Sequence, residues 1–366
     1  MSVALNVDYQ YMAQALRLAG QGLNTTSPNP RVGCVVVKHH QIIGSGAHLK
    51  AGEPHAEVFA LRQTGAEAQG ADIYVTLEPC SHFGKTPPCV EAVIAAQPKR
   101  VIIAMQDPNP LVSGQGIARL RAAGIEVVLG VMELEARQLN AGFVSRMVRG
   151  MPLVRSKVAA SLDGRTALSN GKSQWITSGL ARLDVQHWRA QSCAIITGIG
   201  TVLADNPSMT VRLKNTSRQP LRVVVDSHLQ TPQDALILQG GHVLIAYAQD
   251  NYHQANKLKA VGVDLLLLPD ANNRVDLKAL LKHLAQRGIN EVLIEAGQGL
   301  NGAFLQAGLI DEFIFYYAPK LMGAEAKGMF AIPALLEMHQ AIELQVFDVR
   351  QVGQDIRVCA RSVQSN

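Results

Sequence analysis

The chain has 366 residues, of which 48% are hydrophobic and 17% charged, and its formal net charge is +5. This composition excludes a disordered chain and a coiled coil, and the length suits two domains that each bury a core. The mild positive charge suits nucleic acid and phosphorylated metabolites equally well, and no arginine-rich run is present.

Targeting signals are not recognisable in the sequence. The segment Met1 to Tyr9 lacks a basic stretch followed by an apolar one, so we expect no signal peptide. Apolar runs such as Leu265 to Leu268 are far shorter than the roughly 20 residues of a membrane-spanning helix. Five cysteines, an odd number, argue against a disulfide framework. We therefore expect a cytosolic protein.

The first part of the chain alternates between helical and strand patterns. The residue spacing predicts helices at 9–21, from Pro54 onward, and at 89–96, 116–123 and 132–147. It predicts strands at 32–37, 41–47, 72–77, 100–105 and 126–129. Strands that alternate with helices favour an α/β sandwich, which we place at residues 1–147.

The segment 149–152 is the best candidate for a junction, and a second domain at 151–366 follows it. A helix is expected at 179–190. Strands are expected at 153–160, 193–197, 221–225, 243–247, 263–268, 291–295, 313–317, 342–349 and 355–361. Because the last two strands look antiparallel and helices lie between several of the others, this is an α/β domain with a mixed sheet.

Residue types that bind metals stand together in the first domain. His55 and Glu57 open the helix after Pro54, and Cys80 and Cys89 flank a polar stretch. One imidazole and two thiolates balance the charge of one Zn²⁺ and leave a position for water, as in catalytic zinc sites. Glu57 is then placed to carry a proton from water to a leaving amine. An H-x-E segment followed by P-C and a second cysteine is typical of zinc-dependent base deaminases.

The spacing of the two cysteines leaves alternatives open. Cytidine and tRNA-adenosine deaminases have P-C-x-x-C, whereas eight residues separate Cys80 from Cys89. Polar residues without a metal are one alternative, and a metal-stabilised binding protein is another, although three ligands beside a glutamate argue against it. A tRNA or other nucleic-acid deaminase with an appended binding domain suits the basic pI, but no RNA-binding motif is recognisable.

The wider motifs resemble one family closely. They are P-N-P-R-V-G at 28–33, A-G-E-P-H-A-E at 51–57 and T-L-E-P-C-S-H-F-G-K-T-P-P-C at 76–89. These are similar to the bifunctional riboflavin-biosynthesis deaminase–reductases, and 157–165, 173–177 and 198–212 extend the resemblance into the second domain. The resemblance implies an N-terminal domain like cytidine deaminase and a C-terminal domain similar in fold to dihydrofolate reductase.

The resemblance also implies two reactions. A zinc site deaminates 2,5-diamino-6-(5-phosphoribosylamino)pyrimidin-4-one, and NADPH then reduces the ribosyl group to an open ribityl chain. In the first domain the family pattern implies a pyrimidine contact at Asn29 and a pocket-facing His48. It further implies that the long segment between the cysteines helps shape the pocket through His82 and Lys85, with Lys85 as a phosphate partner.

In the second domain the family pattern implies that Lys157 is the group nearest the sugar. The implied substrate and phosphate contacts are Ser173, Arg189, Met209, Arg212 and Glu295. The implied contacts with the nicotinamide nucleotide are Ala159, Trp175, Thr201, Asp205 and Ser227. For Trp175 and Met209 a place in the hydrophobic core is the alternative interpretation.

A glycine-rich run follows the expected strand at 291–295. Its residues match G-x-G-x-x-G and open a helix, which taken alone suggests a Rossmann domain. The acidic ribose partner expected about 20 residues later is missing, so we interpret the run as a phosphate cradle in another fold. The missing acid also favours NADPH over NADH. The expected cradle comprises Gly297, Gln298, Gly299, Leu300, Asn301, Gly302 and Ala303.

These observations lead to one expected function. We expect a two-step enzyme with one Zn²⁺ per chain and NADPH, which acts on a small phosphorylated pyrimidine. We expect a homo-oligomer that binds neither nucleic acid nor a membrane.

Overall fold

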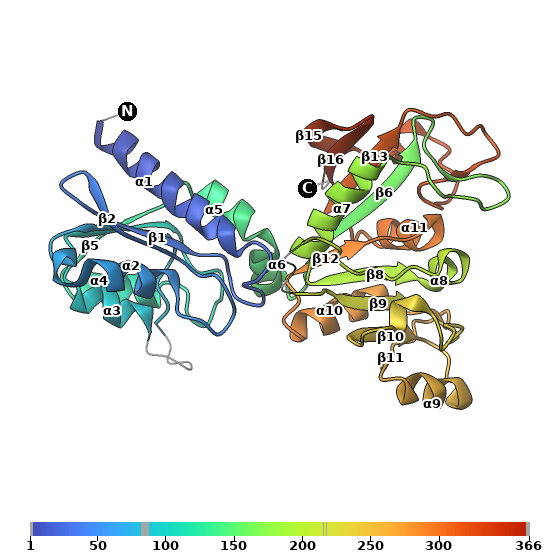
Figure 1. Ribbon diagram of the computed structural model, residues 1–366, viewed down its shortest axis with the longest axis horizontal. Coiled ribbons are helices and arrows are strands. Elements are labelled where there is room, and N and C mark those ends of the chain that lie inside the picture. Colours follow the sequence, from blue (N-terminus) through green and yellow to red (C-terminus); the bar gives the residue numbers. More distant parts are fainter. Residues whose placement is uncertain (1–2, 82–87, 215, 217, 364–366) are drawn as a thin grey trace. The chain divides into compact units, whose positions relative to one another are not determined.

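The computed structural model describes residues 3–81, 88–214, 216 and 218–363. Contacts between Cα atoms divide the chain into two compact units, Met1–Met151 and Pro152–Asn366 (Figure 1). This division falls within the junction expected at 149–152. None of the described helices is both long enough and apolar enough to cross a membrane.

The first unit is built on a five-stranded sheet with the order β2-β1-β3-β4-β5. Strand β1 is antiparallel to both of its neighbours, whereas β3, β4 and β5 are parallel to one another. All five strands were expected from their apolar runs, with bounds that differ by at most one residue. They are β1 (Gly33–Lys38), β2 (Gln41–Ala47), β3 (Asp72–Leu77), β4 (Arg100–Met105) and β5 (Glu126–Leu129).

Helices cover both faces of this sheet (Figure 1). On one face lie α1 (Val3–Ala19) and α5 (Glu133–Leu139), and on the other α2 (Ala56–Thr64), α3 (Cys89–Ala95) and α4 (Gln115–Ala122). Helix α1 approaches β1 so closely that a Cβ at Gly33 would lie 1.9 Å from the carbonyl oxygen of Ala15. Short 3-10 helices, Gly20–Gly22 and Gly65–Ala68, follow α1 and α2.

The single helix expected at 132–147 is wrong, because the structure has two helices there. Helix α5 ends at Leu139, and α6 (Ala141–Arg149) begins after Asn140, whose φ of -110° is not helical. The Asn140 side chain is used elsewhere. Its Oδ1 accepts the backbone N–H of Arg31 at 2.7 Å, and its Nδ2 donates to the Arg31 carbonyl at 3.0 Å. This pair of bonds ties the break to the loop before β1.

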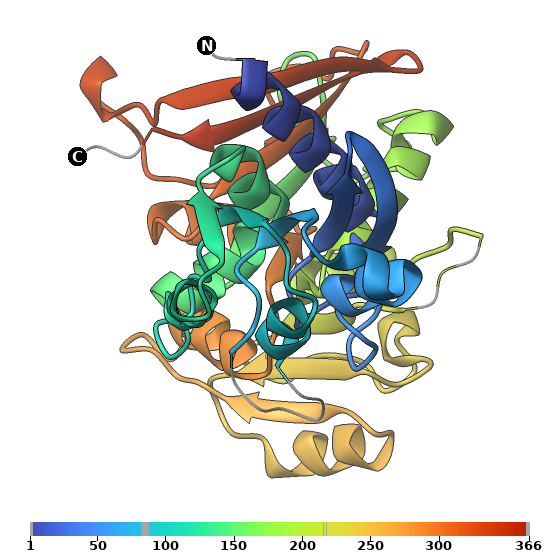
Figure 2. The same ribbon diagram turned by 90° about the vertical axis from the view of Figure 1, so that its left-hand side faces the viewer.

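The second unit is built on a nine-stranded sheet with the order β11-β10-β9-β8-β12-β6-β13-β16-β15. Strands from β11 to β13 in this order are mutually parallel, and β16 and β15 are antiparallel additions at one edge. Figure 2 shows the β15–β16 hairpin at one edge and β11 at the other. The expected mixed sheet is therefore confirmed.

The strands of this sheet agree with the expected runs, with shifts of up to three residues at their ends. They are β6 (Leu153–Ser161), β8 (Ala194–Gly198), β9 (Leu221–Val225), β10 (Val243–Tyr247), β11 (Asp264–Leu267), β12 (Glu291–Ile294), β13 (Glu312–Ala318), β15 (Leu344–Val352) and β16 (Asp355–Ser362). A separate pair joins β7 (Arg165–Ala167) to β14 (Lys327–Gly328).

The helices of the second unit connect these strands. They are α7 (Gly179–Gln191), α8 (Ile199–Asp205), α9 (Tyr252–Ala260), α10 (Leu277–Gln286) and α11 (Gln298–Gln306), with 3-10 turns at Leu236–Leu238 and Met338–Gln340. Because the crossovers run between parallel strands, the carboxyl ends of these strands lie along one edge of the sheet, where α/β proteins bind ligands.

Candidate active sites

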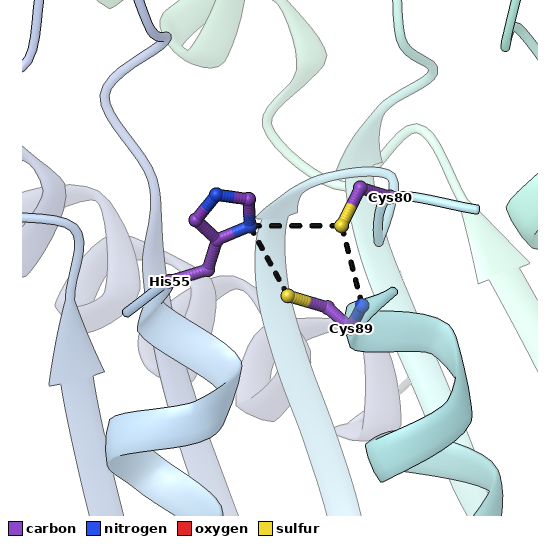
Figure 3. Close-up of side chains that lie close together, drawn as sticks. All are labelled: His55, Cys80 and Cys89. Carbon is purple, nitrogen blue, oxygen red and sulfur yellow. Dashed lines mark hydrogen bonds between the residues drawn. The ribbon is translucent and has the colours of Figure 1, made fainter. Parts of the chain in front are cut away.

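Three side chains that can bind a metal meet in the first unit. His55 lies directly before α2, Cys80 follows β3, and Cys89 begins α3, so three separate elements supply them. The His55 Nδ1 lies 3.1 Å from the Cys89 Sγ and 3.6 Å from the Cys80 Sγ (Figure 3). All three ligand atoms lie within 4.8 Å of one another.

This spacing fits one zinc ion. Tetrahedral Zn²⁺ with Zn–N and Zn–S bonds of about 2.1 and 2.3 Å separates its nitrogen and sulfur ligands by about 3.6 Å. The 3.6 Å from His55 Nδ1 to the Cys80 Sγ equals that value, and the 3.1 Å to the Cys89 Sγ is somewhat shorter. Three ligands also leave the fourth position open, which is the arrangement of a catalytic rather than a structural zinc site.

Proton sharing within this group favours a thiolate. Hydrogen bonds from the Cys89 side chain and from His55 lower the pKa of Cys80 to about 4, despite its burial. The hydrogen bond between the two cysteine side chains raises the pKa of Cys89, so Cys89 keeps the proton of this pair. The backbone N–H of Cys89 also donates to the Cys80 Sγ at 3.2 Å. A thiolate is the form of cysteine that binds metals, and the lowered pKa of Cys80 favours that form.

Glu57 is the second residue of α2 and is buried, with 3% of its surface exposed. Burial and the nearby Cys80 raise the pKa of its carboxyl group to about 7. Among the described residues, its Oε2 has no hydrogen-bond partner, although it is buried. A buried carboxylate oxygen without a hydrogen-bond partner costs free energy, unless a bound ligand supplies that partner. A group with a pKa near 7 can also both accept and release a proton at neutral pH.

Glu78 organises the segment that carries Cys80, and sequence analysis did not single it out. It is buried, and its two oxygens accept backbone N–H groups from a distant segment. Oε2 accepts from Asp107 and Gly114 at 3.1 and 2.9 Å, and Oε1 from Gly116 and Ile117 at 2.8 and 3.2 Å. The only sequence signal was its position two residues before Cys80.

Two of the expected pocket residues lie beside the metal-binding group. Asn29 Nδ2 is 3.1 Å from His48 Nε2, and His48 Nδ1 is 3.2 Å from the carbonyl oxygen of Pro54. The His48 ring meets the His55 ring edge-on, with centroids 5.1 Å apart. Burial lowers the pKa of His48, which favours its neutral form. The other two expected pocket residues, His82 and Lys85, lie outside the described residues.

The second unit contains a cavity of about 1170 Å³. Its lining comes from segments that follow the carboxyl ends of several parallel strands, among them Gly198–Thr201 after β8, Ser227 after β9 and Glu295–Gly299 after β12. This is the edge at which the parallel sheet of an α/β protein binds ligands. The volume is large enough for a dinucleotide and a second small molecule together.

A buried ionic cluster forms one part of this cavity. The Glu295 carboxylate, after β12, lies 3.0 Å from the Lys157 ammonium on β6 and 2.5 Å from Arg189 Nε on α7. Burial alone would raise the pKa of Glu295, but the attraction of Arg189 and Lys157 outweighs it and lowers the pKa to about 2. Glu295 is therefore ionised, and it orients the two cations toward the cavity.

The structure brings together most of the residues expected in this unit. The expected residues that line the cavity are Lys157, Ala159, Ser173, Trp175, Arg189, Thr201, Asp205, Met209, Arg212, Ser227, Glu295, Gly297, Gln298, Gly299, Leu300 and Ala303.

Asn301 and Gly302 do not line the cavity, unlike the rest of the glycine-rich run. Asn301 is buried, accepts from Ser156 Oγ at 3.0 Å and donates to the carbonyl oxygen of Ala296 at 2.8 Å. A Cβ at Gly302 would lie 2.2 Å from the carbonyl oxygen of Ala331. Both residues therefore serve the packing of α11, because helical periodicity turns them away from the ligand side.

Two sequence families match the two units separately. Residues 5–105 match the family described as the cytidine and deoxycytidylate deaminase zinc-binding region. Residues 152–358 match the family described as the RibD C-terminal domain. The chain is thus a zinc-binding deaminase joined to a reductase that uses a nicotinamide cofactor. The expected fold class, a cytidine-deaminase-like domain followed by a mixed-sheet reductase domain, is confirmed.

Full-length relatives share both units. The chain is 49% identical over 362 residues to the riboflavin biosynthesis protein RibD of Escherichia coli, covering 95% of this chain and 98% of the relative. It superposes on the RibD structure from Acinetobacter baumannii with a TM-score of 0.92 and 50% identity, covering 98% and 100% of the two chains. The chain therefore belongs to the RibD family, the bifunctional deaminase–reductases of riboflavin biosynthesis.

A third relative carries the two activities in its description. A Thermotoga maritima structure described as a diaminohydroxyphosphoribosylaminopyrimidine deaminase and 5-amino-6-(5-phosphoribosylamino)uracil reductase matches with a TM-score of 0.87 and 33% identity. The match covers 98% of this chain and 99% of that one. The alternative of a nucleic-acid deaminase with an appended binding domain is not favoured, because the second unit matches a reductase family.

Proposed function

We propose that the domain at 1–147 deaminates 2,5-diamino-6-(5-phosphoribosylamino)pyrimidin-4-one and that the domain at 151–366 reduces the ribosyl group of the product to ribityl phosphate. The substrate is a small phosphorylated pyrimidine rather than a nucleic acid. A cytosolic location suits this chemistry, because the metal site needs two reduced thiols and all five cysteines are free.

In the deaminase domain His55, Cys80 and Cys89 would hold one Zn²⁺. Zinc, when bound, supplies a Lewis acid that lowers the pKa of water in its open position. Glu57 would take a proton from the attacking water and deliver it to the leaving amine. Its pKa of about 7 and an Oε2 that has no hydrogen-bond partner among the described residues both suit this role. The proposed ring contacts are Asn29 and His48, and the proposed pocket residues of the intervening segment are His82 and Lys85.

In the reductase domain NADPH, when bound, would supply the hydride. Lys157 would lie beside the ribosyl group, and Glu295 holds the Lys157 ammonium group in position. The other proposed substrate contacts are Ser173, Arg189, Met209 and Arg212. The proposed cofactor contacts are Ala159, Trp175, Thr201, Asp205, Ser227 and the run from Gly297 to Ala303, in which Asn301 and Gly302 act by packing the cradle.

One observation carries the deaminase proposal. Three atoms of the kinds that bind zinc lie within 4.8 Å of one another. The buried Glu57 is close by, and its Oε2 has no hydrogen-bond partner among the described residues. The test is an assay of the purified protein with the phosphoribosylamino-pyrimidine, in which ammonia release and NADPH oxidation are followed separately. Ammonia release from cytidine or tRNA, with none from that compound, would contradict the proposal.

The variant Glu57→Gln separates the two activities. We expect it to retain zinc, measured by elemental analysis, because Glu57 is not a ligand. Ammonia release should fall about 10²- to 10⁴-fold, the usual contribution of a general acid–base group. NADPH oxidation with deaminated substrate should persist at the wild-type rate. If both activities disappeared together, the proposal of two independent sites would be wrong.

We also propose that the chain forms a homo-oligomer through β15. This strand is an edge of the nine-stranded sheet, and it exposes apolar side chains at Val346, Phe347 and Val349. An exposed apolar edge strand is a natural site of pairing with a second copy. Light scattering during gel filtration should report a dimer or larger assembly for the wild type and a monomer for Val349→Lys. A monomeric wild-type chain would contradict this proposal.

A further inference from the structure

The cavity of the reductase unit extends well beyond the buried cluster around Glu295. Its lining includes the segment from Asp270 to Lys278, which follows β11 near the far edge of the sheet. The two strands between β8 and β11 separate this segment from the segments after β8 and β12. The cavity therefore has a second charged end, to which neither the sequence motifs nor the relatives assign a role.

The turn after β11 has a defined shape. Asp270 Oδ1 accepts the backbone N–H groups of Asn272 and Arg274, both at 2.8 Å, and the Asp270 N–H donates to the Arg274 carbonyl oxygen at 2.7 Å. The next backbone N–H, that of Val275, donates to Ser227 Oγ at 3.3 Å. The residue directly after Arg274 is thus tied to the serine that follows β9, one of the proposed cofactor contacts, and Arg274 and this serine line the same cavity.

The cationic side chains at this end have no hydrogen-bond partner among the described residues, whereas the carboxylates accept backbone N–H groups. In the part of the chain that the structure describes, the side chains of Arg274 and Lys278 make no hydrogen bond or ion pair. Both side chains are exposed and line the cavity. The two nearby carboxylates bind backbone amides instead, because Asp270 closes its turn and Asp276 Oδ1 caps α10 through the Ala279 N–H at 2.9 Å.

We propose that Arg274, with Ser227 and Lys278, binds the 2′-phosphate of NADPH and sets the preference for NADPH over NADH. This proposal rests on the proposed reductase function and adds the residues that select the cofactor. A phosphate monoester carries a charge of about −1.5 to −2 and three strong acceptor oxygens, which an arginine fork can bind in a bidentate manner. NADH has a 2′-hydroxyl there and cannot use the two cations.

The first test measures binding without turnover. Isothermal titration of the wild-type protein with 2′,5′-ADP and with 5′-AMP should give about 10- to 100-fold tighter binding of 2′,5′-ADP. Arg274→Ala should remove most of that difference, Arg274→Lys should keep part of it, and Lys278→Ala should reduce it a few-fold. Lys282→Ala is the matched control, because Lys282 is an exposed residue of the same helix that does not line the cavity.

The second test measures turnover with deaminated substrate. For the wild type the KM for NADH should exceed the KM for NADPH, and Arg274→Ala should shrink this ratio about 10-fold or more, whereas Lys282→Ala should leave it unchanged. Equal affinity of the wild type for 2′,5′-ADP and 5′-AMP, or an unchanged difference in Arg274→Ala, would overturn the assignment. Tight 2′,5′-ADP binding without oxidation of either nucleotide would instead overturn the proposed reductase function and support the phosphate site.

Discussion

Each of the two units buries one carboxyl group in its candidate active site, and the surroundings shift the pKa values of these two groups in opposite directions. Glu57 is buried beside cysteine sulfurs, and its pKa rises to about 7. Glu295 is buried to a similar degree but lies between Lys157 and Arg189, and its pKa falls to about 2. Burial alone therefore does not decide the charge of a carboxyl group, because fixed cations nearby can outweigh it.

This difference matches two kinds of chemistry. A carboxyl group with a pKa near 7 can exchange protons at neutral pH, which a hydrolytic deamination needs. A carboxylate that stays ionised at neutral pH can hold other groups in place, which suits a hydride transfer that depends on positioning. The candidate deaminase site gathers a few side chains around one proposed metal position, whereas the residues expected in the reductase unit line a cavity along the edge of a sheet.

The largest expected effect is the loss of ammonia release when one of the three proposed metal ligands of the first unit is removed. Cys89→Ser removes one of three metal ligands, and we expect loss of zinc and a fall in ammonia release on the order of 10³-fold or more. NADPH oxidation with deaminated substrate should stay within twofold of wild type. Elemental analysis and the two separate assays check this outcome. Normal ammonia release by a zinc-free variant would show that the cysteines are not functional ligands.

Replacing Glu295 probes the carboxylate that stays ionised. The change in its pKa from 4.5 to about 2 corresponds to about 3 kcal/mol of stability. Because the folded-state pKa is the lower one, this contribution is present above pH 4.5 and is lost as the pH falls toward 2. We expect Glu295→Gln to lower the free energy of unfolding of the second unit by about 3 kcal/mol at pH 7, and by less at pH 3.

Tryptophan fluorescence during urea unfolding can measure this change. Both tryptophans of the chain, Trp175 and Trp188, lie in the second unit, so the signal reports on that unit. Asp264→Asn is the control, because Asp264 pairs with Arg287 at the surface and should contribute under about 1 kcal/mol. The same loss for Glu295→Gln at pH 3 and pH 7 would show that packing rather than charge stabilises the cluster.

A smaller effect is expected from the carboxylate behind the metal site. The two Glu78 oxygens together accept four backbone N–H groups, and Glu78→Gln replaces one of these oxygens by an amide NH₂ group that cannot accept. We expect the free energy of unfolding of the first unit to fall by about 2–3 kcal/mol. Zinc release on heating, followed with a chromogenic chelator, should occur at a lower temperature. Glu91→Gln, at an exposed ion pair with Arg119, should change this temperature little. Equal shifts for the two variants would rule out a special role for Glu78.

The smallest kinetic effect tests the glycine-rich run. Asn301→Ala removes two buried hydrogen bonds, so we expect a loss of about 1–2 kcal/mol in stability but less than a twofold change in the KM for NADPH. Gln298→Ala, at a residue that lines the cavity, should raise that KM instead. A large KM increase in Asn301→Ala alone would mean that Asn301 contacts the cofactor after all.

Much of the fold and of the metal site could be predicted from the residues. Strands such as β3 and β9 are mostly apolar runs between polar segments, which local pattern alone identifies. His55, Cys80 and Cys89 are residue types with few other uses in polar surroundings, so their chemistry could be proposed without their geometry. The break at Asn140 was missed, because its bonds with Arg31 join residues far apart in the chain.

By itself, the sequence determined the family and predicted a ligand set and a proton carrier, since residue type and local spacing encode these features. Only the tertiary structure decided that Glu78 holds the segment of Cys80, that Asn301 does not line the cavity, and that Val275, next to Arg274, bonds to Ser227. The reason is physical. The charge of a carboxyl group and the direction of a side chain depend on neighbours that the folding of distant segments brings together.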